Sequence, residues 1–357
     1  LDAVPYIWKQ LGTNCRNLPQ VHTIVRIMRM ICEIVCPGVL LLGEVVMAPE
    51  KVVPYFGTVE KPECHLLYNV TTMASTWHTV ATKDVSLLRR QLDIISELPR
   101  DYVFQNYLRC HDDIGWGLDY EYLENFGIQE VPHKKYLNDF LTGKYPDSFA
   151  RGELYNDDPR LGDARLCGTT ASLCGIERFG FEGNQEGVDR AVRYDITLHA
   201  FMFSQSGIPV IYSGDEIGQV NDYSYKDDPE KSDDSRYLHR GKFDWKLAEN
   251  RHDPATVQGK LFPALDKLEH MRTSHSVFNS NVPFHTIDTW DNSILAFVRE
   301  NDEEKFIGIY NFSENDKVAW INEEDGMYTD LISGRELEAK GVQIPAFGCY
   351  WLCRSKK

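Results

Sequence analysis

Three carboxylic acids stand where a parallel sheet would present them for chemistry. Asp2, Glu44 and Asp112 each lie at or near the end of a segment with the pattern of a β-strand. In an α/β barrel the catalytic groups come from the carboxyl ends of the strands, because the loops that follow form the active face. Two carboxyls about 5–5.5 Å apart suit retaining glycoside chemistry, in which one attacks the anomeric carbon and the other donates a proton and later accepts one. A single carboxylate at a strand end is more often a helix cap or a surface charge, so the prediction depends on the set of three.

The neighbours of these acids fit that chemistry. Glu44 follows the apolar run 39–42, where desolvation would raise its pKa, as a general acid requires. His111 precedes Asp112 and could donate to a sugar hydroxyl, although an imidazole satisfied by local contacts is the alternative. A third carboxylate can bind sugar hydroxyls and favour a positively charged transition state.

The segments that carry the acids alternate between strand and helix. Residues 1–9 are strand-like. Residues 20–35 place apolar side chains at offsets of three and four, which indicates one face of a helix, and the run 39–42 is typical of a buried parallel strand. The same pattern predicts strands at 65–69, 102–110 and 207–212, with helices at 71–98 and 189–206. The sequence therefore predicts βα units of a parallel sheet.

Two regions depart from this rhythm. Residues 114–184 are rich in Gly, Asp, Asn and aromatic residues and show few clean periods, which indicates an inserted subdomain or long functional loop. From about residue 282 onward, short strands alternate with turn residues, which is typical of a small antiparallel domain.

The composition limits the classes of function. The chain has 357 residues, and 38 Lys+Arg against 54 Asp+Glu give a net charge of −16. This acidic balance argues against nucleic acid and against an anionic membrane as partner, since both favour a basic face. No apolar stretch reaches the roughly 18 residues that a membrane span needs. A neutral small-molecule substrate is compatible with these properties.

The sequence predicts neither a metal nor a cofactor. Two cysteine pairs have the spacing of zinc ligands, Cys32/Cys36 and Cys349/Cys353. Neither pair has a His pair beside it, so the favoured interpretation of the nine cysteines is free thiols in a reducing, cytoplasmic compartment, with metal or disulfide use as the alternative. The acidic stretches 227–228 and 233–234 lack the alternation of a calcium loop and are interpreted as solvated charge.

Several ordered motifs resemble those of a known family. They are Asp2-Ala3-Val4, Ile7-Trp8-Lys9-Gln10, Leu41-Leu42-Gly43-Glu44-Val45, Leu108-Arg109-Cys110-His111-Asp112-Asp113, Ser148-Phe149-Ala150-Arg151-Gly152, Tyr212-Ser213-Gly214-Asp215-Glu216 and Lys231-Ser232-Asp233-Asp234-Ser235-Arg236. In order and spacing they resemble motifs of glycoside hydrolase family 13, the α-amylase superfamily, and the closer resemblance is to amylosucrases. The likeness runs over nearly the whole chain.

The resemblance implies the fold class: α/β, with the C-terminal part of a (β/α)8 TIM barrel that carries an inserted subdomain, followed by a small antiparallel β-sandwich domain. The expected parts are a partial barrel with strands 4 to 7 (1–113), an inserted lid (114–184), the end of the barrel with strand 8 (185–280) and the sandwich (281–357). By the same resemblance, the missing N-terminal barrel half belongs to the same polypeptide, and we expect this chain alone to be weakly active or inactive.

The resemblance also implies roles for individual residues. Asp2 is similar to the nucleophile of the family, Glu44 to the general acid/base and Asp112 to the transition-state stabiliser. His111 would lie in the glucose pocket. Three further residues are expected to bind substrate, Asp113, Arg165 and Arg236, and Lys134 stands near the place of an arginine that holds the glucan acceptor.

The function implied is a retaining glucosyltransferase that cleaves sucrose and transfers glucose to an α-glucan. The alternatives are a hydrolase of sucrose or α-glucosides on the same site, and a non-catalytic carbohydrate-binding fragment. A sucrose phosphorylase is less favoured, because the sequence shows no dedicated phosphate cradle.

Overall fold

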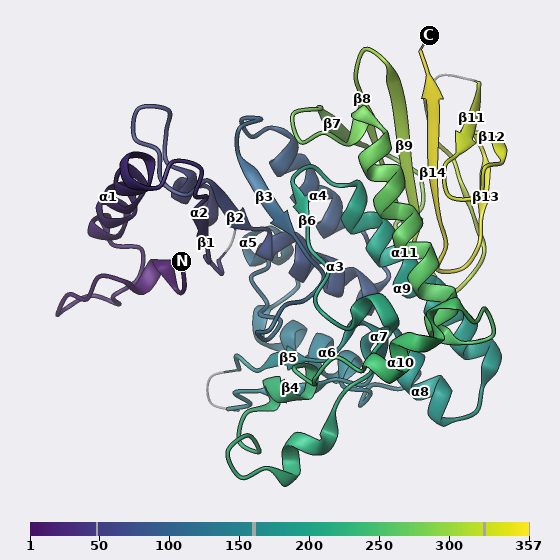
Figure 1. Ribbon diagram of the computed structural model, residues 1–357, viewed down its shortest axis with the longest axis horizontal. Helices are drawn as coiled ribbons and strands as arrows, with labels where there is room; N and C mark the ends of the chain where they lie inside the picture. The colour runs from purple at the N-terminus through teal and green to yellow at the C-terminus, as the bar shows by residue number, and fades with distance from the viewer. Residues whose placement is uncertain (48, 159–161, 324–325, 357) are drawn as a thin grey trace.

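The parallel sheet predicted for the first half of the chain is present. The computed structural model describes residues 1–47, 49–158, 162–323 and 326–356, so the expected barrel, lid and sandwich ranges each include a few residues outside the described ones. Four strands pair in parallel in the order β1-β2-β3-β6 (Figure 1). Their bounds are Leu42–Gly43, Leu66–Tyr68, Val103–Asn106 and Ile208–Pro209. The strands are short, and the loops that follow their carboxyl ends carry the acidic residues.

Helices connect these strands and cover the sheet. The α-helices are α1 Pro19–Val35, α2 Pro49–Val52, α3 Val70–Thr82, α4 Ser86–Ser96, α5 Tyr120–Glu124, α6 Glu130–Leu141, α7 Thr170–Cys174, α8 Ile176–Phe181, α9 Gln185–Ser204, α10 Trp245–Ala248 and α11 Val257–Ser274. The 3-10 helices are Val4–Tyr6, Val53–Phe56, Asp215–Ile217, Tyr223–Asp227, Ser235–His239, Glu249–His252 and Ser276–Phe278. On α1 only Val21 and Val25 are buried, and several apolar side chains of the same helix stay exposed.

The segment 1–9 is not a strand, contrary to the prediction. It forms a 3-10 turn at Val4–Tyr6, which begins after Ala3 in the left-handed conformation (φ 44°). Pro5 explains the difference, because proline favours the first turn of a helix and has no N–H for a sheet ladder. The segment nevertheless lies along β1, since the Glu44 N–H donates to the Leu1 carbonyl at 3.0 Å.

The helix predicted over 71–98 is two helices. Lys83 ends α3 in the left-handed conformation (φ 60°), and α4 starts three residues later. The Lys83 ammonium donates to the Val80 carbonyl. It also lies 4.8–5.5 Å from four ring centroids, those of Phe140, Phe149, Tyr194 and Phe347. Tertiary contacts with the lid, α9 and the C-terminal region therefore accompany a break that the apolar periodicity did not reveal.

The lid region packs below the parallel sheet in the view of Figure 1. It contains α5 to α8 and a two-stranded antiparallel sheet of β4 (Glu153–Tyr155) and β5 (Arg165–Cys167). A bridge between Ile114 and Leu166 ties this sheet to the segment that follows β3.

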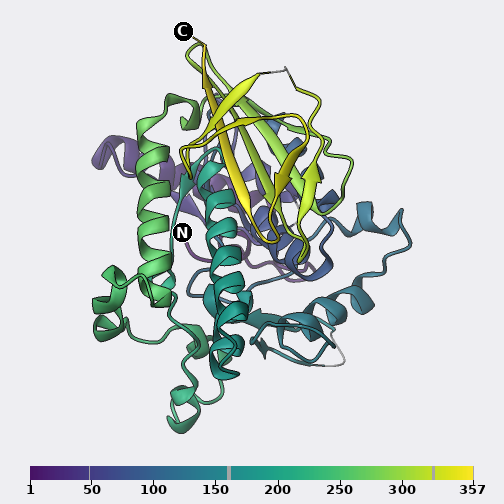
Figure 2. The ribbon, with the colours of Figure 1, turned by 90° about the vertical axis from the view of Figure 1, so that its right-hand side faces the viewer.

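The C-terminal region is antiparallel, as predicted. Six strands pair in the order β12-β11-β14-β9-β8-β7, and β10 pairs with β13. Their bounds are β7 Phe284–Ile287, β8 Ile294–Glu300, β9 Glu304–Asn311, β10 Lys317–Ala319, β11 Met327–Asp330, β12 Glu336–Glu338, β13 Val342–Ile344 and β14 Cys349–Ser355. One face of the large sheet shares a core with β10 and β13, and the other packs toward α9 and α11, which run side by side (Figure 2).

Among the described residues, no helix combines the length and the apolar character that crossing a bilayer requires.

Trp77 on α3 supports the strand end that carries the predicted site. Its side chain is 0% exposed, and its indole N–H donates to the Leu108 carbonyl at 2.7 Å, three residues before His111. We expect Trp77→Ala to lower the free energy of unfolding by about 3–5 kcal/mol, because a large core side chain is lost. Trp245→Ala is the matched control, since that indole is 78% exposed, and it should change stability by less than about 0.5 kcal/mol. Urea denaturation checks both, and equal losses would contradict the prediction.

Candidate active site

Two adjoining clefts lie beside the acidic residues that follow β1 and β3. The smaller cleft, of about 460 Å³, is lined by Leu1, Asp2, Leu42, Glu44, Val46, Tyr68, Val70, Met73, Tyr107, Cys110, His111, Asp112, Asp113 and Gly115. The larger cleft, of about 870 Å³, shares Glu44, Val46, Asp112, Asp113 and Gly115 with it. The remaining lining of the larger cleft includes Arg16, Lys51, Lys134, Tyr155, Arg165 and Arg236.

All eight residues predicted for the site line these clefts. Asp2 and His111 line the smaller cleft, and Glu44, Asp112 and Asp113 line both. Three residues line the larger cleft alone, namely Lys134, Arg165 and Arg236. The structure thus brings the predicted set together, while the roles assigned to its members stay predictions.

Glu44 stands directly after β1, at the border between the clefts. Burial raises the pKa of Glu44, and the neighbouring Asp2 and Asp112 carboxyls raise it further. The Ala3 N–H, which donates to Glu44 Oε2 at 2.7 Å, partly opposes this shift. A raised pKa is the property that a general acid needs, and the adjacent Asp2 gives Glu44 the companion that retaining chemistry needs.

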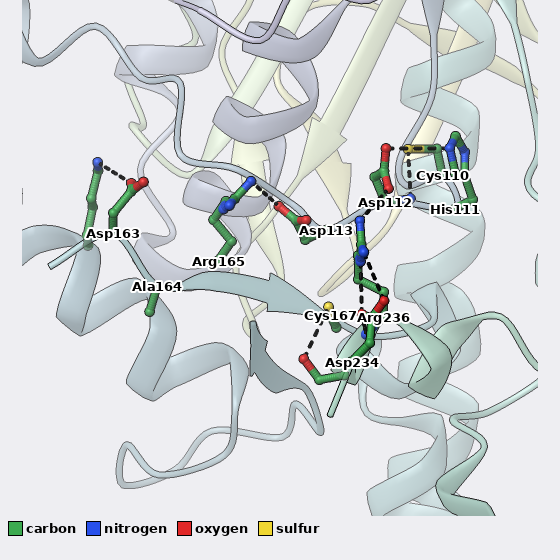
Figure 3. Close-up of polar contacts among 12 residues, drawn as sticks. Cys110, His111, Asp112, Asp113, Asp163, Ala164, Arg165, Cys167, Asp234 and Arg236 are labelled. Carbon is green, nitrogen blue, oxygen red and sulfur yellow. Dashed lines mark hydrogen bonds and ion pairs between the residues drawn. The ribbon is translucent and has the colours of Figure 1, made fainter. Parts of the chain in front are cut away.

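Asp112 is held by two arginines. Its Oδ1 accepts from Arg236 Nη1 at 3.2 Å and from Arg240 Nη2 at 3.1 Å, and His111 Nε2 lies 3.4 Å from its Oδ2. Arg236 is in turn fixed by two contacts with Asp234, at 2.9 and 2.8 Å (Figure 3). The carboxylate partners of Arg236 in the structure are thus Asp234 and Asp112.

Asp113 faces the lid. Arg165 on β5 forms an ion pair with its carboxylate at 3.2 Å, and Figure 3 shows the two side chains pointing toward one another. Burial raises the pKa of Asp113, although the Arg165 charge works in the opposite direction. The guanidinium groups of Arg165 and Arg236 both lie over the ring of Tyr155, at 5.4 and 4.6 Å. Tyr155 therefore holds two arginines in the larger cleft.

Lys134 is engaged within the lid. Its ammonium contacts Glu130 at 2.7 Å and Asp163 at 3.3 Å. Trp116 is 6% exposed and donates its indole N–H to Asn138 Oδ1 at 2.8 Å. The geometry thus places Trp116 in the core. The Lys134 ammonium is paired with two carboxylates and is therefore less available to a glucan acceptor.

The basic side chains that support Asp112 were not all predicted from the sequence. Arg240 donates to Asp112 and also to the His111 carbonyl. Arg109 forms a buried ion pair with Asp215 at 2.9 Å, each side chain being 2% exposed, and donates to the His239 carbonyl at 3.2 Å. Arg109 and Asp215 both lie inside quoted motifs, so their opposite charges were a usable signal for pairing. Arg240 carried no signal beyond its place four residues after Arg236.

One group outside the clefts could hold a metal. Among the described residues, His275, Glu304 and Cys353 place donor atoms within 4.8 Å of one another. Cys349, which the sequence spacing pairs with Cys353, is not part of this group. Neither cleft contains this donor set.

Similarity searches identify relatives of the chain. No family model matches it. Glucosylglycerate phosphorylase of Escherichia coli (strain K12) is 26% identical over 354 residues, which cover 99% of this chain and 59% of that protein. Trehalose synthase of Thermus thermophilus is 28% identical over 220 residues, covering 61% of this chain and 19% of that protein. The chain therefore spans less than two thirds of the length of these relatives.

Solved structures show the same fold. Sucrose 6F-phosphate phosphorylase from Thermoanaerobacter thermosaccharolyticum matches with a TM-score of 0.63 at 19% identity, over 95% of this chain and 59% of that one. An α-amylase from H. orenii matches with a TM-score of 0.53 at 15% identity, over 95% and 57%. The fold is thus the α/β barrel type with a C-terminal antiparallel sheet, as predicted.

The relatives support the resemblance to glycoside hydrolase family 13, the α-amylase superfamily, and the structure neighbours show the fold. Within it, the two relatives named are a glucosylglycerate phosphorylase and a trehalose synthase, so the closer resemblance to amylosucrases stays a prediction.

The raised pKa of Glu44 gives a stability test. Because the folded state binds this proton more tightly than the unfolded chain, ionised Glu44 destabilises the fold once the pH rises above the ordinary carboxyl range. We expect Glu44→Gln to raise Tm at pH 7 and to leave it nearly unchanged at about pH 4, where a carboxyl is largely protonated. Glu124→Gln, at an exposed position on α5, is the control and should show no such difference. A Tm gain for Glu44→Gln that does not depend on pH would contradict this explanation.

Proposed function

We propose that the chain carries the catalytic site of a retaining α-glucosyl phosphorylase, which transfers glucose from an α-glucoside to inorganic phosphate. The observation that supports this most directly is the placement of Glu44, with its raised pKa, beside Asp2 and between the two clefts. The likeness to a glucosylglycerate phosphorylase over 99% of the chain supports phosphate as the acceptor.

The proposed reaction has two displacements. In the first, the Asp2 carboxylate attacks C1 of the glucosyl unit, the C1–O bond to the leaving group breaks, and the leaving oxygen takes the proton of Glu44. In the second, a phosphate oxygen attacks C1, its proton passes to Glu44, and the bond to Asp2 breaks. Glucose 1-phosphate and the free alcohol of the leaving group are the products. The smaller cleft, with Asp2, His111 and Asp112, is the proposed glucose pocket.

Transfer to an α-glucan, the amylosucrase reaction, is the second candidate, with sucrose as the donor. The ordered motifs favour it. The larger cleft favours it less, because the Lys134 ammonium is already paired with Glu130 and Asp163. Hydrolysis on the same site remains the alternative in which water is the acceptor.

We also propose that a preceding part of the same polypeptide completes the barrel beside β1. The strand β1 ends the parallel sheet, and α1 exposes apolar side chains nearby, namely Ile27, Met30, Ile31, Ile34 and Val35. An edge strand and an apolar helix face are normally covered in a soluble protein. The cytoplasmic location and the absence of nucleic-acid or membrane partners stay predictions.

The acceptor can be tested in the full-length protein. It is incubated with glucosylglycerate or sucrose, with and without inorganic phosphate, while glucose 1-phosphate, free glucose, fructose and glucan are measured. We expect glucose 1-phosphate to form only with phosphate, and Asp2→Asn to abolish it, because the nucleophile is removed. Loss of this step should lower the rate by about 10⁴-fold or more.

The other outcomes decide between the alternatives. Fructose in excess over free glucose, together with glucan, would favour the amylosucrase reaction. Free glucose equal to the released alcohol, independent of phosphate, would show a hydrolase. No product from a protein shown by circular dichroism to be folded would favour carbohydrate binding without catalysis.

A further inference from the structure

The basic side chains of the larger cleft are unequally partnered. Three of its cations have carboxylate partners: Arg165 with Asp113, Arg236 with Asp112 and Asp234, and Lys134 with Glu130 and Asp163. Within the described part of the chain, no carboxylate lies in ion-pair contact with Arg16 or Lys51, although both line the same cleft. In a chain of net charge −16, two cations left without an acidic partner in one cleft call for a physical reason.

Arg16 also has unused hydrogen-bonding capacity. Its Nη2 donates to the Val46 carbonyl at 3.1 Å, while its Nε is buried and has no hydrogen-bond partner among the described residues. Buried donors are nearly always paired in native proteins, so an unpaired one in a cleft indicates a missing acceptor. The planar guanidinium fork is suited to carboxylate and phosphate oxygens.

The loop that carries Arg16 is fixed by its own contacts. The Arg16 backbone N–H donates to Asn14 Oδ1 at 3.1 Å. The next residue, Asn17, accepts from the Tyr55 hydroxyl at 2.6 Å and is in the left-handed conformation (φ 57°). The ring of Tyr6 lies 5.7 Å from the guanidinium carbon. Arg16 is therefore held on a constrained loop that already faces the cleft.

The position of Arg16 relative to the acids indicates which part of the substrate it can contact. Val46, whose carbonyl it contacts, is two residues beyond Glu44. Glu44 lines both clefts, whereas Asp2 lines the smaller and Arg16 the larger. If Asp2 attacks from the glucose side, the leaving group and the incoming acceptor must both reach Glu44 from the side of the larger cleft, because Glu44 exchanges a proton with each of them.

We propose that Arg16, with Lys51, forms an anion subsite that binds the acidic group of the leaving group and of the acceptor in turn. This inference depends on the proposed function, because it takes the larger cleft as the acceptor side. One subsite can serve a carboxylate of a small hydroxy acid and inorganic phosphate, since the two occupy it at different stages of the reaction. The ligands it selects are small oxyanions in preference to neutral polyols.

Binding, measured apart from turnover, tests the subsite. Full-length protein carrying Asp2→Asn is titrated by calorimetry with glycerate, inorganic phosphate and glycerol, alone and combined with Arg16→Gln, Lys51→Gln or Arg29→Gln. We expect Arg16→Gln to weaken binding of the two anions by about ten- to a hundredfold, as loss of a charge-assisted hydrogen bond does. Lys51→Gln should weaken them less, because a single flexible ammonium is lost. Glycerol binding should not change.

Arg29→Gln is the matched control, because that guanidinium on α1 already has Glu33 as its partner at 2.5 Å and lies outside both clefts. It should bind both anions like the parent. Arg16→Lys, which keeps the charge and loses the fork, should retain part of the affinity and guards against a folding defect in Arg16→Gln.

The outcomes separate the sources of the anion. If Arg16→Gln weakens the binding of glycerate alone, the subsite belongs to the leaving group. If it weakens the binding of phosphate alone, the subsite belongs to the acceptor. If it weakens the binding of both anions, the shared role is supported. Unchanged anion affinity in Arg16→Gln, or no anion binding by the parent, would overturn the subsite. If Arg16-dependent binding is found but the unmutated protein forms no glucose 1-phosphate, the proposed function fails while the anion subsite stands.

Discussion

Like charges held close together are the constraint around which the site is built. Four carboxyls, those of Asp2, Glu44, Asp112 and Asp113, line the smaller cleft, and each of them would disfavour ionisation of the others. The structure offsets this unevenly. Asp112 receives two guanidinium groups and Asp113 one, whereas no cation lies in ion-pair contact with Glu44 among the described residues. Burial and the neighbouring acids raise the pKa of Glu44, which is the property that the environment must give to a carboxyl that donates a proton.

The cations that offset the repulsion come from segments remote in sequence, so the surrounding loops are part of the site. Arg236 and Arg240 belong to the segment after β6, and Arg165 to a strand of the lid. The buried pair of Arg109 and Asp215 ties the end of β3 to the start of the segment that carries these arginines. An ion pair with both partners buried is costly to break from one side, because the remaining charge has no water to solvate it. The pair therefore holds the acids that follow β3 in a fixed position relative to the arginines that contact them.

The parallel sheet and the convergence of the acids could be predicted, because the carboxyl ends of parallel strands meet at one edge of the sheet whatever the loops do. The βα pattern located β2 and β3, and Glu44 directly follows β1 as predicted, whereas β3 ends at Asn106, six residues before Asp112. Local patterning failed where tertiary contacts decide. The turn at Lys83 accompanies packing among four aromatic rings from distant segments, and the segment around Pro5 lies along β1 without joining its ladder. The ion pairs of Asp112 were not predicted: Arg236 was expected to bind substrate, and Arg240 was not singled out, because sequence spacing does not show which side chains meet across distant loops.

The two clefts also explain why motif similarity and overall similarity point to different acceptors. The motifs that resemble amylosucrases include Asp2, Glu44, His111 and Asp112, which line the smaller cleft, the proposed place of the glucosyl unit. An enzyme that transfers glucose to any acceptor needs those groups, so they carry little information about what receives it. Arg16 and Lys51 stand outside the quoted motifs and line only the larger cleft. If the larger cleft decides among water, glucan and a small oxyanion as acceptor, residues that resemble a catalytic motif carry no information on that choice. The feature that carries it is the pair of cations in the larger cleft that have no carboxylate partner among the described residues.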